Sequence, residues 1–163
     1  MQDNSTTISE PTPQDVDGLA NLFLSDMKSL NMPVTFEDMR TLALKVVEDV
    51  GSQKSGAVCW VAKIDGDPTP VGVILANTNW SLKFAGLALW IEELYVAEIA
   101  RRRGIGRILV EHLLDFADSE GYAGIDLEAY QGNAPASILY RSLGFHRLGR
   151  ERFYYRMGPE ERF

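Results

Sequence analysis

Seven consecutive residues of this 163-residue chain, Arg101 to Arg107, combine four arginines with two glycines. A strand-like run precedes them and a helical pattern follows, so the glycines lie in a turn between a strand and a helix. The first N–H groups of a helix have no partner within it, and the helix dipole places partial positive charge there. Because Gly104 and Gly106 lack a Cβ and the arginines add charge, the segment predicts a phosphate-binding loop rather than a solvated basic patch.

Two well-known phosphate loops do not fit this segment. A Walker A loop needs a lysine directly after its last glycine, and this chain has Arg107 there. A dinucleotide-binding loop needs a third glycine at the position of Leu109. The spacing that remains is Arg101-x-x-Gly104-x-Gly106.

A second motif follows a strand-like run at residues 125–130. Together, the loop and this motif resemble the GNAT superfamily of acyl-CoA N-acyltransferases in spacing, order and separation. The close resemblance covers roughly a third of the chain. The second motif reads Asn133-x-x-Ala136-x-x-x-Tyr140-x-x-x-Gly144-Phe145.

The resemblance implies a fold and a cofactor. The expected fold is α/β of the α+β kind, with a mostly antiparallel sheet of six to seven strands and about four flanking helices. In the family the arginine–glycine loop wraps the coenzyme A pyrophosphate, and the backbone of the strand before it pairs with pantetheine. The residues that the resemblance places at acetyl-CoA are Leu94, Tyr95, Val96, Arg101, Arg102, Arg103, Gly104, Ile105, Gly106, Arg107, Asn133, Ala136 and Tyr140.

Tyr140 is identified by the resemblance as the general acid beside the coenzyme A sulfur. A phenol with a pKa of about 10 can donate a proton to a thiolate whose thiol has a pKa of about 8.5. The structural alternative is a core tyrosine on the last helix. Asn133 is expected to hold pantetheine, to cap that helix, or to do both.

Glu92 and Glu93 are the candidates for binding or deprotonating an acceptor amine. Neighbouring residues on a strand point to opposite faces, so only one of the two can face the acceptor unless a bulge intervenes. Alternation predicts that Glu92 shares a face with Leu94, and that Glu93 shares the other with Ile91 and Tyr95. We favour Glu92, with Glu93 as the second candidate. Their acidic run also resembles that of diamine acetyltransferases, which points to a polyamine-like acceptor.

The function that follows is transfer of an acetyl group from acetyl-CoA to a primary amine of a small molecule, by direct attack in a ternary complex. Two alternatives stay open: acetylation of a protein or peptide, and a non-catalytic module that binds acyl-CoA. Retention of Tyr140 and of the acidic strand favours the enzyme, because a binding module needs neither.

Composition narrows the classes of protein. The net charge of −7 argues against a non-specific nucleic-acid binder. Cys59 is the sole cysteine, so it is expected to be a buried strand residue and not part of a disulfide. The sequence shows no signal peptide, no membrane span and no metal-ligand cluster, which predicts a cytoplasmic protein without a metal or a membrane or nucleic-acid partner.

The rest of the chain is expected to complete a single domain, 1–163. Two helices precede residue 51, the first starting at Thr12-Pro13 and the second capped by Thr35 with Asp38. A hairpin at residues 57–75 and two closing strands at residues 145–148 and 153–157 complete the sheet. Many relatives dimerise through their closing strands, so the aromatic run at residues 153–155 is expected either to serve a homodimer or to form ordinary core.

Overall fold

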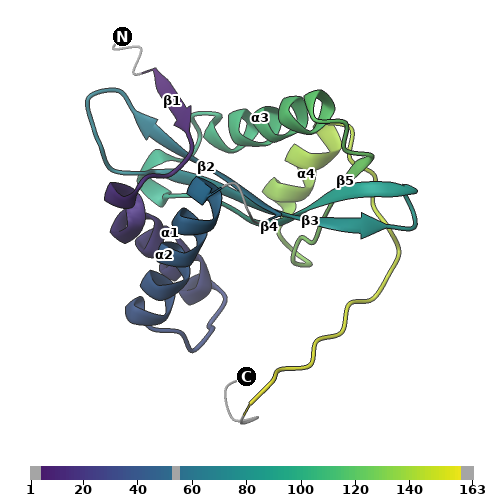
Figure 1. Ribbon diagram of the computed structural model, residues 1–163, viewed down its shortest axis with the longest axis horizontal. Helices are drawn as coiled ribbons and strands as arrows, with labels where there is room; N and C mark the ends of the chain where they lie inside the picture. Colours follow the sequence, from purple (N-terminus) through teal and green to yellow (C-terminus); the bar gives the residue numbers. More distant parts are fainter. Residues whose placement is uncertain (1–4, 53–55, 159–163) are drawn as a thin grey trace.

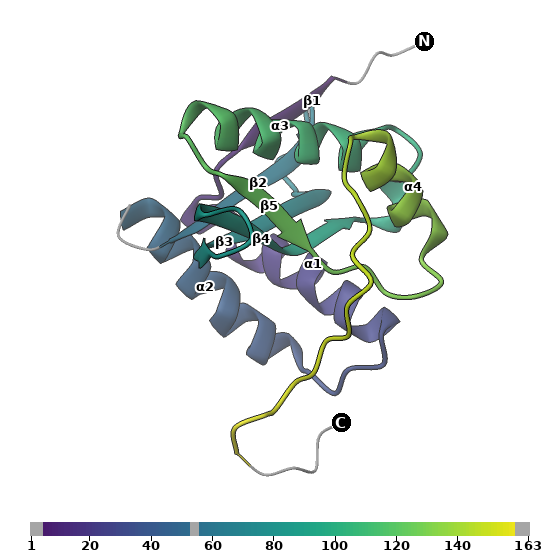
Figure 2. The same ribbon diagram turned by 90° about the vertical axis from the view of Figure 1, so that its right-hand side faces the viewer.

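The computed structural model describes residues 5–52 and 56–158, which form one sheet between two helical layers (Figures 1 and 2). The strands lie in the order β1-β2-β3-β4-β5; the first four are antiparallel, and β5 runs parallel to β4. The strands are β1 (Thr6–Ser9), β2 (Ala57–Ile64), β3 (Gly72–Ser81), β4 (Gly86–Val96) and β5 (Gly124–Leu127). The helices are α1 (Val16–Ser29), α2 (Phe36–Ser52), α3 (Ile105–Ser119) and α4 (Ala134–Ser142), with short 3-10 turns at Pro13–Asp15 and Glu98–Ala100.

Helices α1 and α2 cover one face of the sheet, and both begin with caps that the sequence predicts. Thr12 caps the 3-10 turn that leads into α1; its N–H donates to Asp15 at 2.9 Å, and buried Asp15 pairs with Lys63 Nζ at 2.6 Å. At α2, the Thr35 N–H donates to Asp38 at 2.9 Å and the Asp38 N–H donates to Thr35 Oγ1 at 3.2 Å. These bonds satisfy helix N–H groups that would otherwise lack partners.

Helices α3 and α4 cover the opposite face. The cluster beneath them includes Trp60, Ile74, Leu89, Ile91 and Leu113, against which the last helix packs with partly buried residues. A separate cluster fills the space beneath α1 and α2 and contains Cys59, which is buried as predicted. The sheet therefore has an apolar core on each face.

A β-bulge interrupts β4 at Glu92. Leu75 of β3 pairs with Glu93, whereas its neighbour Ala76 pairs with Ile91, so Glu92 is the extra residue. The bulge shifts the phase of every later side chain on β4 by one position.

This shift corrects the face assignment that strict alternation predicts. Ile91 packs in the cluster beneath α3, whereas Tyr95 packs against the cluster beneath α1 and α2. Glu93 lies opposite Leu75, a member of the latter cluster, so it faces α1 and α2. Ile91 and Glu93 therefore do not share a face.

Beyond the bulge, β4 and β5 separate. Their pairing runs from Ala88 opposite Gly124 to Ile91 opposite Leu127 and ends there. The last five residues of β4 thus have no strand partner on the β5 side within the described chain. The crossover from β4 to β5 passes through α3, as a parallel connection requires.

The sheet has fewer strands than the expected six to seven, because neither closing strand is formed. Residues 145–148 and 153–157 pair with no strand, and the segment after α4 runs past the end of β5 toward α1 and α2 (Figure 2). A strand needs hydrogen-bonded neighbours and one face to bury, and three consecutive aromatics define no such face. The side chains of Phe153, Tyr154 and Tyr155 are exposed, so the ordinary-core alternative is wrong.

Smaller differences concern element ends. The second helix, expected before residue 51, continues to Ser52; residues 53–55 lie outside the described chain. Strand β3 extends to Ser81, and at the tip of the β3–β4 hairpin Trp80 is exposed while the ring of Phe84 packs over Gly124. None of the helices described here has the length and apolar character that crossing a membrane demands.

Candidate active site

The turn before α3 has the backbone geometry that a phosphate site needs. Arg102 and Gly104 both have positive φ angles, +63° and +75°. Gly104 is the N-cap of α3. Because glycine has no side chain to accept a hydrogen bond, the first-turn N–H groups of this helix have no side-chain cap. The Gly104 carbonyl accepts from the Ile108 N–H at 3.0 Å, which fixes the start of the helix.

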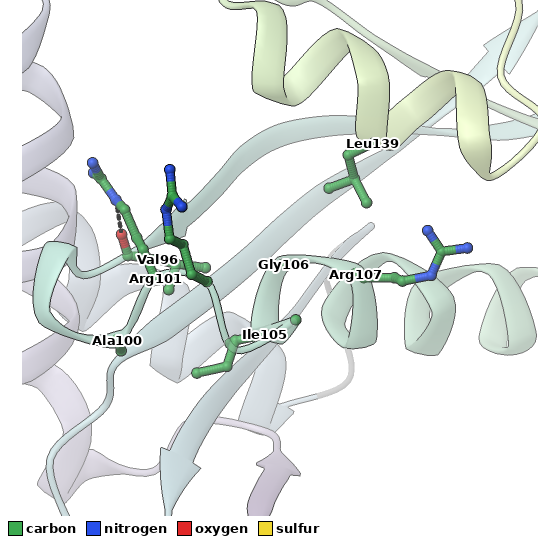
Figure 3. Close-up of a pocket in the computed structure, with 9 residues that line it drawn as sticks. Val96, Ala100, Arg101, Ile105, Gly106, Arg107 and Leu139 are labelled. Atoms are coloured by element: carbon green, nitrogen blue, oxygen red, sulfur yellow. Dashed lines mark hydrogen bonds between the residues drawn. The ribbon is translucent and has the colours of Figure 1, made fainter.

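A cavity of about 230 Å³ opens above this turn (Figure 3). We call it the loop pocket. A Cβ on Gly106 would lie at ordinary contact distance, 3.7 Å from Leu139 Cδ2 and 3.8 Å from Val96 Cγ2, so it would occupy space between these two lining residues. The loop pocket is lined by Val96, Ala100, Arg101, Arg102, Gly104, Ile105, Gly106, Arg107 and Leu139.

The four arginines of the turn have different surroundings. Arg101 Nε donates to the Val96 carbonyl at 3.1 Å, and its guanidinium lies 5.5 Å from the centre of the Tyr95 ring. Arg107 Nε pairs with Glu111 at 3.0 Å, and its Nη1 donates to Ser142 at 2.9 Å, which ties α3 to α4.

Arg102 lines the loop pocket together with Arg101 and Arg107, whereas Arg103 is exposed outside it. The pocket thus combines free helix N–H groups with three cationic side chains, an arrangement suited to a phosphate.

A second cavity of about 100 Å³, which we call the acidic pocket, lies on the other side of β4 beneath α1 and α2. Glu92 and Glu93 both line it, because the bulge brings two neighbouring carboxyl groups to the same opening. The rest of the lining is apolar: Phe23 and Met27 of α1, Met39 and Leu42 of α2, and Leu75 of β3.

Glu93 has the most perturbed carboxyl group of the site. Burial raises its pKa to about 9, and the charge of Asp26 and a hydrogen bond with its side chain add to the effect, as does the charge of Glu92. A hydrogen bond from the Leu94 N–H acts in the opposite direction. Glu92, by contrast, is exposed. At neutral pH the Glu93 carboxyl group is therefore mainly protonated, and its ionised form, which can accept a proton, increases as pH rises toward 9.

Tyr140 is within electrostatic range of Glu93, although it lines neither pocket. It projects from α4, packs against the cluster beneath α3 and makes an edge contact with Phe145, with ring centres 5.6 Å apart. Burial, together with the negative charge of Glu93, raises the pKa of Tyr140 to about 12. The phenol therefore stays protonated at neutral pH, and its environment includes the carboxyl group of the acidic pocket.

The remaining predicted residues lie on the elements expected of them. Asn133 caps α4, because its Oδ1 accepts from the Ala136 N–H at 3.3 Å; this confirms the structural half of its predicted role. Leu94 and Val96 lie beyond the bulge, where β4 has separated from β5, and pack their side chains against the cluster beneath α3.

Sequence reasoning missed two groups at the site, Asp26 and Leu139. Asp26 is the hydrogen-bond partner of Glu93 and lies four residues after buried Leu22 on α1. That spacing places the Asp26 carboxylate on the buried face of an amphipathic helix, and a carboxylate at such a position could have been recognised from the sequence as a candidate site residue. Leu139 precedes Tyr140 on α4 and lines the loop pocket; nothing in its apolar side chain could have indicated this role from the sequence.

Among the described residues, no three His, Cys, Asp or Glu side chains group as ligands for a metal ion. Comparison with known proteins bears directly on the two pockets. Residues 20–145, which include both of them, match the Acetyltransferase (GNAT) family. The chain belongs to this family. The resemblance predicted from two motifs is therefore confirmed over most of the chain.

Curated members of the family match a shorter stretch. The chain is 46% identical over 55 residues to the [ribosomal protein bS18]-alanine N-acetyltransferase of Salmonella typhimurium, a stretch that covers 34% of this chain and 37% of that protein. It is also 46% identical over 57 residues to the streptothricin acetyltransferase of Streptomyces lavendulae, a stretch that covers 35% of this chain and 30% of that protein. These matches span 37% of the first relative and 30% of the second.

Solved structures match nearly the whole chain. A possible acetyltransferase from Clostridium difficile 630 gives a TM-score of 0.78 at 21% identity, covering 94% of this chain and 99% of that one. An aminoglycoside N-acetyltransferase solved in complex with CoA gives a TM-score of 0.76 at 14% identity, covering 94% of this chain and 96% of that one. The similarity confirms the predicted mixed α+β fold.

Proposed function

We propose that this chain is an N-acetyltransferase that moves an acetyl group from acetyl-CoA to a primary amine of a small molecule. The observation that carries the proposal is that the loop pocket and the acidic pocket lie on opposite sides of β4, and that Glu93 of the acidic pocket acts electrostatically on Tyr140 of α4. Two substrates held in this way are positioned for direct attack, which needs no covalent intermediate on the protein.

The loop pocket would bind the pyrophosphate of acetyl-CoA. The first N–H groups of α3 and the guanidinium groups of Arg101, Arg102 and Arg107 supply hydrogen bonds and positive charge. The unpaired end of β4 offers backbone groups to pantetheine, as an added strand would use them. This pose directs the thioester toward Tyr140.

The acidic pocket would hold the acceptor amine. The ionised form of Glu93, which increases as pH rises toward its pKa of about 9, takes a proton from the ammonium group, so that the nitrogen lone pair can attack the thioester carbon. As the C–N bond forms and the C–S bond breaks, Tyr140 donates its proton to the leaving thiolate. The acetylated nitrogen then loses its second proton to the Tyr140 phenolate, and Glu93 returns its proton to water. We assign the base to Glu93 and not to Glu92, because Glu93 is partly buried and acts electrostatically on Tyr140, whereas Glu92 is exposed.

A cationic acceptor suits the surroundings of this pocket. Asp26, Glu92 and Glu93 contribute three carboxyl groups, and the chain has a net charge of −7. A polyamine-like molecule or another small polycation is the acceptor class that we propose. The match to streptothricin acetyltransferase and the fold similarity to an aminoglycoside acetyltransferase support this class.

A peptide N-terminus is the second candidate, and the match to ribosomal-protein alanine acetyltransferases favours it. The small volume of the acidic pocket favours the small molecule.

Release of CoA from acetyl-CoA, measured against polyamines, aminoglycosides, amino acids and short peptides, tests the proposal and separates the two acceptors. We expect turnover with one class, and a fall of about 100-fold in kcat for Tyr140→Phe with binding of CoA unchanged. Binding of acetyl-CoA without acetylation of any amine would instead support a non-catalytic module.

A further inference from the structure

The C-terminal segment brings a cation to the place where β4 and β5 separate. The Arg152 guanidinium lies 4.4 Å from the centre of the Trp90 ring and forms an ion pair with Glu128. Figure 2 shows this segment descending from α4 past the end of β5. Arg152 therefore links a segment outside the sheet to two residues beside the site.

Trp90 and Glu128 come from the two strands that separate. Trp90 of β4 pairs with Asp126 of β5, and Glu128 directly follows the last residue of β5. Leu89 and Ile91 both pack beneath α3, so alternation places Trp90 on the opposite face, the one that carries the acidic pocket. An aromatic face and a carboxylate together are the groups that bind an ammonium or guanidinium ion.

Tyr130 connects this pair with the acidic pocket. Its pKa is raised first by partial burial and then by the negative charges of Glu128, Asp26 and Glu93, whereas the positive charge of Arg152 lowers it. The Tyr130 hydroxyl group thus lies within electrostatic range of Glu128 and of the two carboxyl groups Asp26 and Glu93. Glu128 and the carboxyl groups of Asp26 and Glu93 therefore all lie around the Tyr130 side chain.

We propose that Trp90 and Glu128 form a second cation subsite of the acceptor site, which Arg152 fills until an acceptor with two positive charges displaces it. This inference rests on the proposed function: the reacting amine occupies the acidic pocket, and a second ammonium or guanidinium group of the same molecule takes the place of Arg152. The side chains of Arg152 and Glu128 are about half exposed (53% and 49%), so water can solvate the displaced guanidinium.

The competing interpretation is a structural strap, in which Arg152 only fastens the C-terminal segment to the sheet. The two interpretations differ in one measurable respect. Removing a strap weakens the fold and acts on all acceptors alike, whereas removing a competing cation improves binding of dications alone.

The test uses the full chain with CoA bound, titrated in a calorimeter with linear diamines from diaminopropane to diaminooctane and with monoamines of matched length. In the parent protein the best diamine should bind at least about 5-fold more tightly than its monoamine. Arg152→Ala should tighten that diamine by a further factor of about 3 or more and leave the monoamine unchanged. Glu128→Gln should abolish the preference for the diamine.

Arg152→Lys is the matched control, because it keeps the cation and should behave as the parent protein does. Equal effects of Arg152→Ala on diamine and monoamine, or a diamine preference that survives Glu128→Gln, would overturn the inference. CoA release is measured separately on the same variants. If the protein acetylates amines but does not prefer diamines over monoamines, only the second-subsite inference is wrong. If it binds diamines preferentially but releases no CoA, only the proposed function is wrong.

Discussion

Replacement of Glu93 by glutamine should make the protein more stable at alkaline pH while removing its activity. The pKa of Glu93 is raised from 4.5 to about 9, mainly by burial. Between these two values the folded protein holds a proton that the unfolded chain has released. The free energy of unfolding therefore falls as pH rises across this window, by at most about 1.4 kcal/mol per pH unit.

From pH 5 to pH 8 the upper limit of this loss is about 4 kcal/mol. Hydrogen bonding from the Leu94 N–H and access of water to the acidic pocket reduce it, and we expect about 2 kcal/mol. Glutamine keeps a donor for Asp26 and cannot ionise. The variant should therefore match the parent protein at pH 5 and exceed it by about 2 kcal/mol at pH 8.

Urea unfolding followed by circular dichroism at pH 5, 6, 7 and 8 measures the difference directly. Glu92→Gln is the control, because it makes the same substitution at the exposed neighbour, and it should change stability by less than about 0.5 kcal/mol at each pH. A Glu93→Gln protein that is less stable than its parent at pH 8, or a difference that does not vary with pH, would refute the proposed environment of Glu93.

Three further substitutions test other parts of the site and the fold. Gly104→Ala places a Cβ at a φ of +75° and should cost about 1 kcal/mol in urea unfolding while raising the KM for acetyl-CoA; an unchanged KM would separate this turn from the cofactor. Asp26→Asn removes a charge that raises the pKa of Glu93, so the rise of kcat/KM with pH should move to lower pH by about 1 unit, and an unmoved profile would argue against Glu93 as the base. Lys63→Met leaves buried Asp15 without its cation and should destabilise the fold by about 3 kcal/mol in the same unfolding assay, whereas a loss below about 1 kcal/mol would contradict the importance of that pair.

The loop pocket could be predicted from sequence because its determinants are local. The positive φ of Gly104, the start of α3 and the cluster of arginines all follow from residues within one turn of one another. The caps of Asn133 and Thr35 were predictable for the same reason.

The acidic pocket could be predicted only in part, because tertiary packing forms it. The bulge at Glu92 is set by how β4 pairs with β3, which a single strand sequence does not encode. Asp26 reaches Glu93 only because α1 packs on β4. The prediction of two closing strands was wrong for a related reason. The aromatic residues at 153–155 have a high propensity for strands, but no neighbouring strand pairs with them.

The central claim is direct transfer between two substrates bound on either side of β4. Initial velocities measured over a grid of acetyl-CoA and amine concentrations test it most directly, together with an acid quench that counts labelled acetyl groups on the protein. Direct transfer should give intersecting double-reciprocal lines and no acetylated protein. Parallel lines, accompanied by a stable acetyl group on the chain, would contradict it, because they would show transfer through a covalent intermediate.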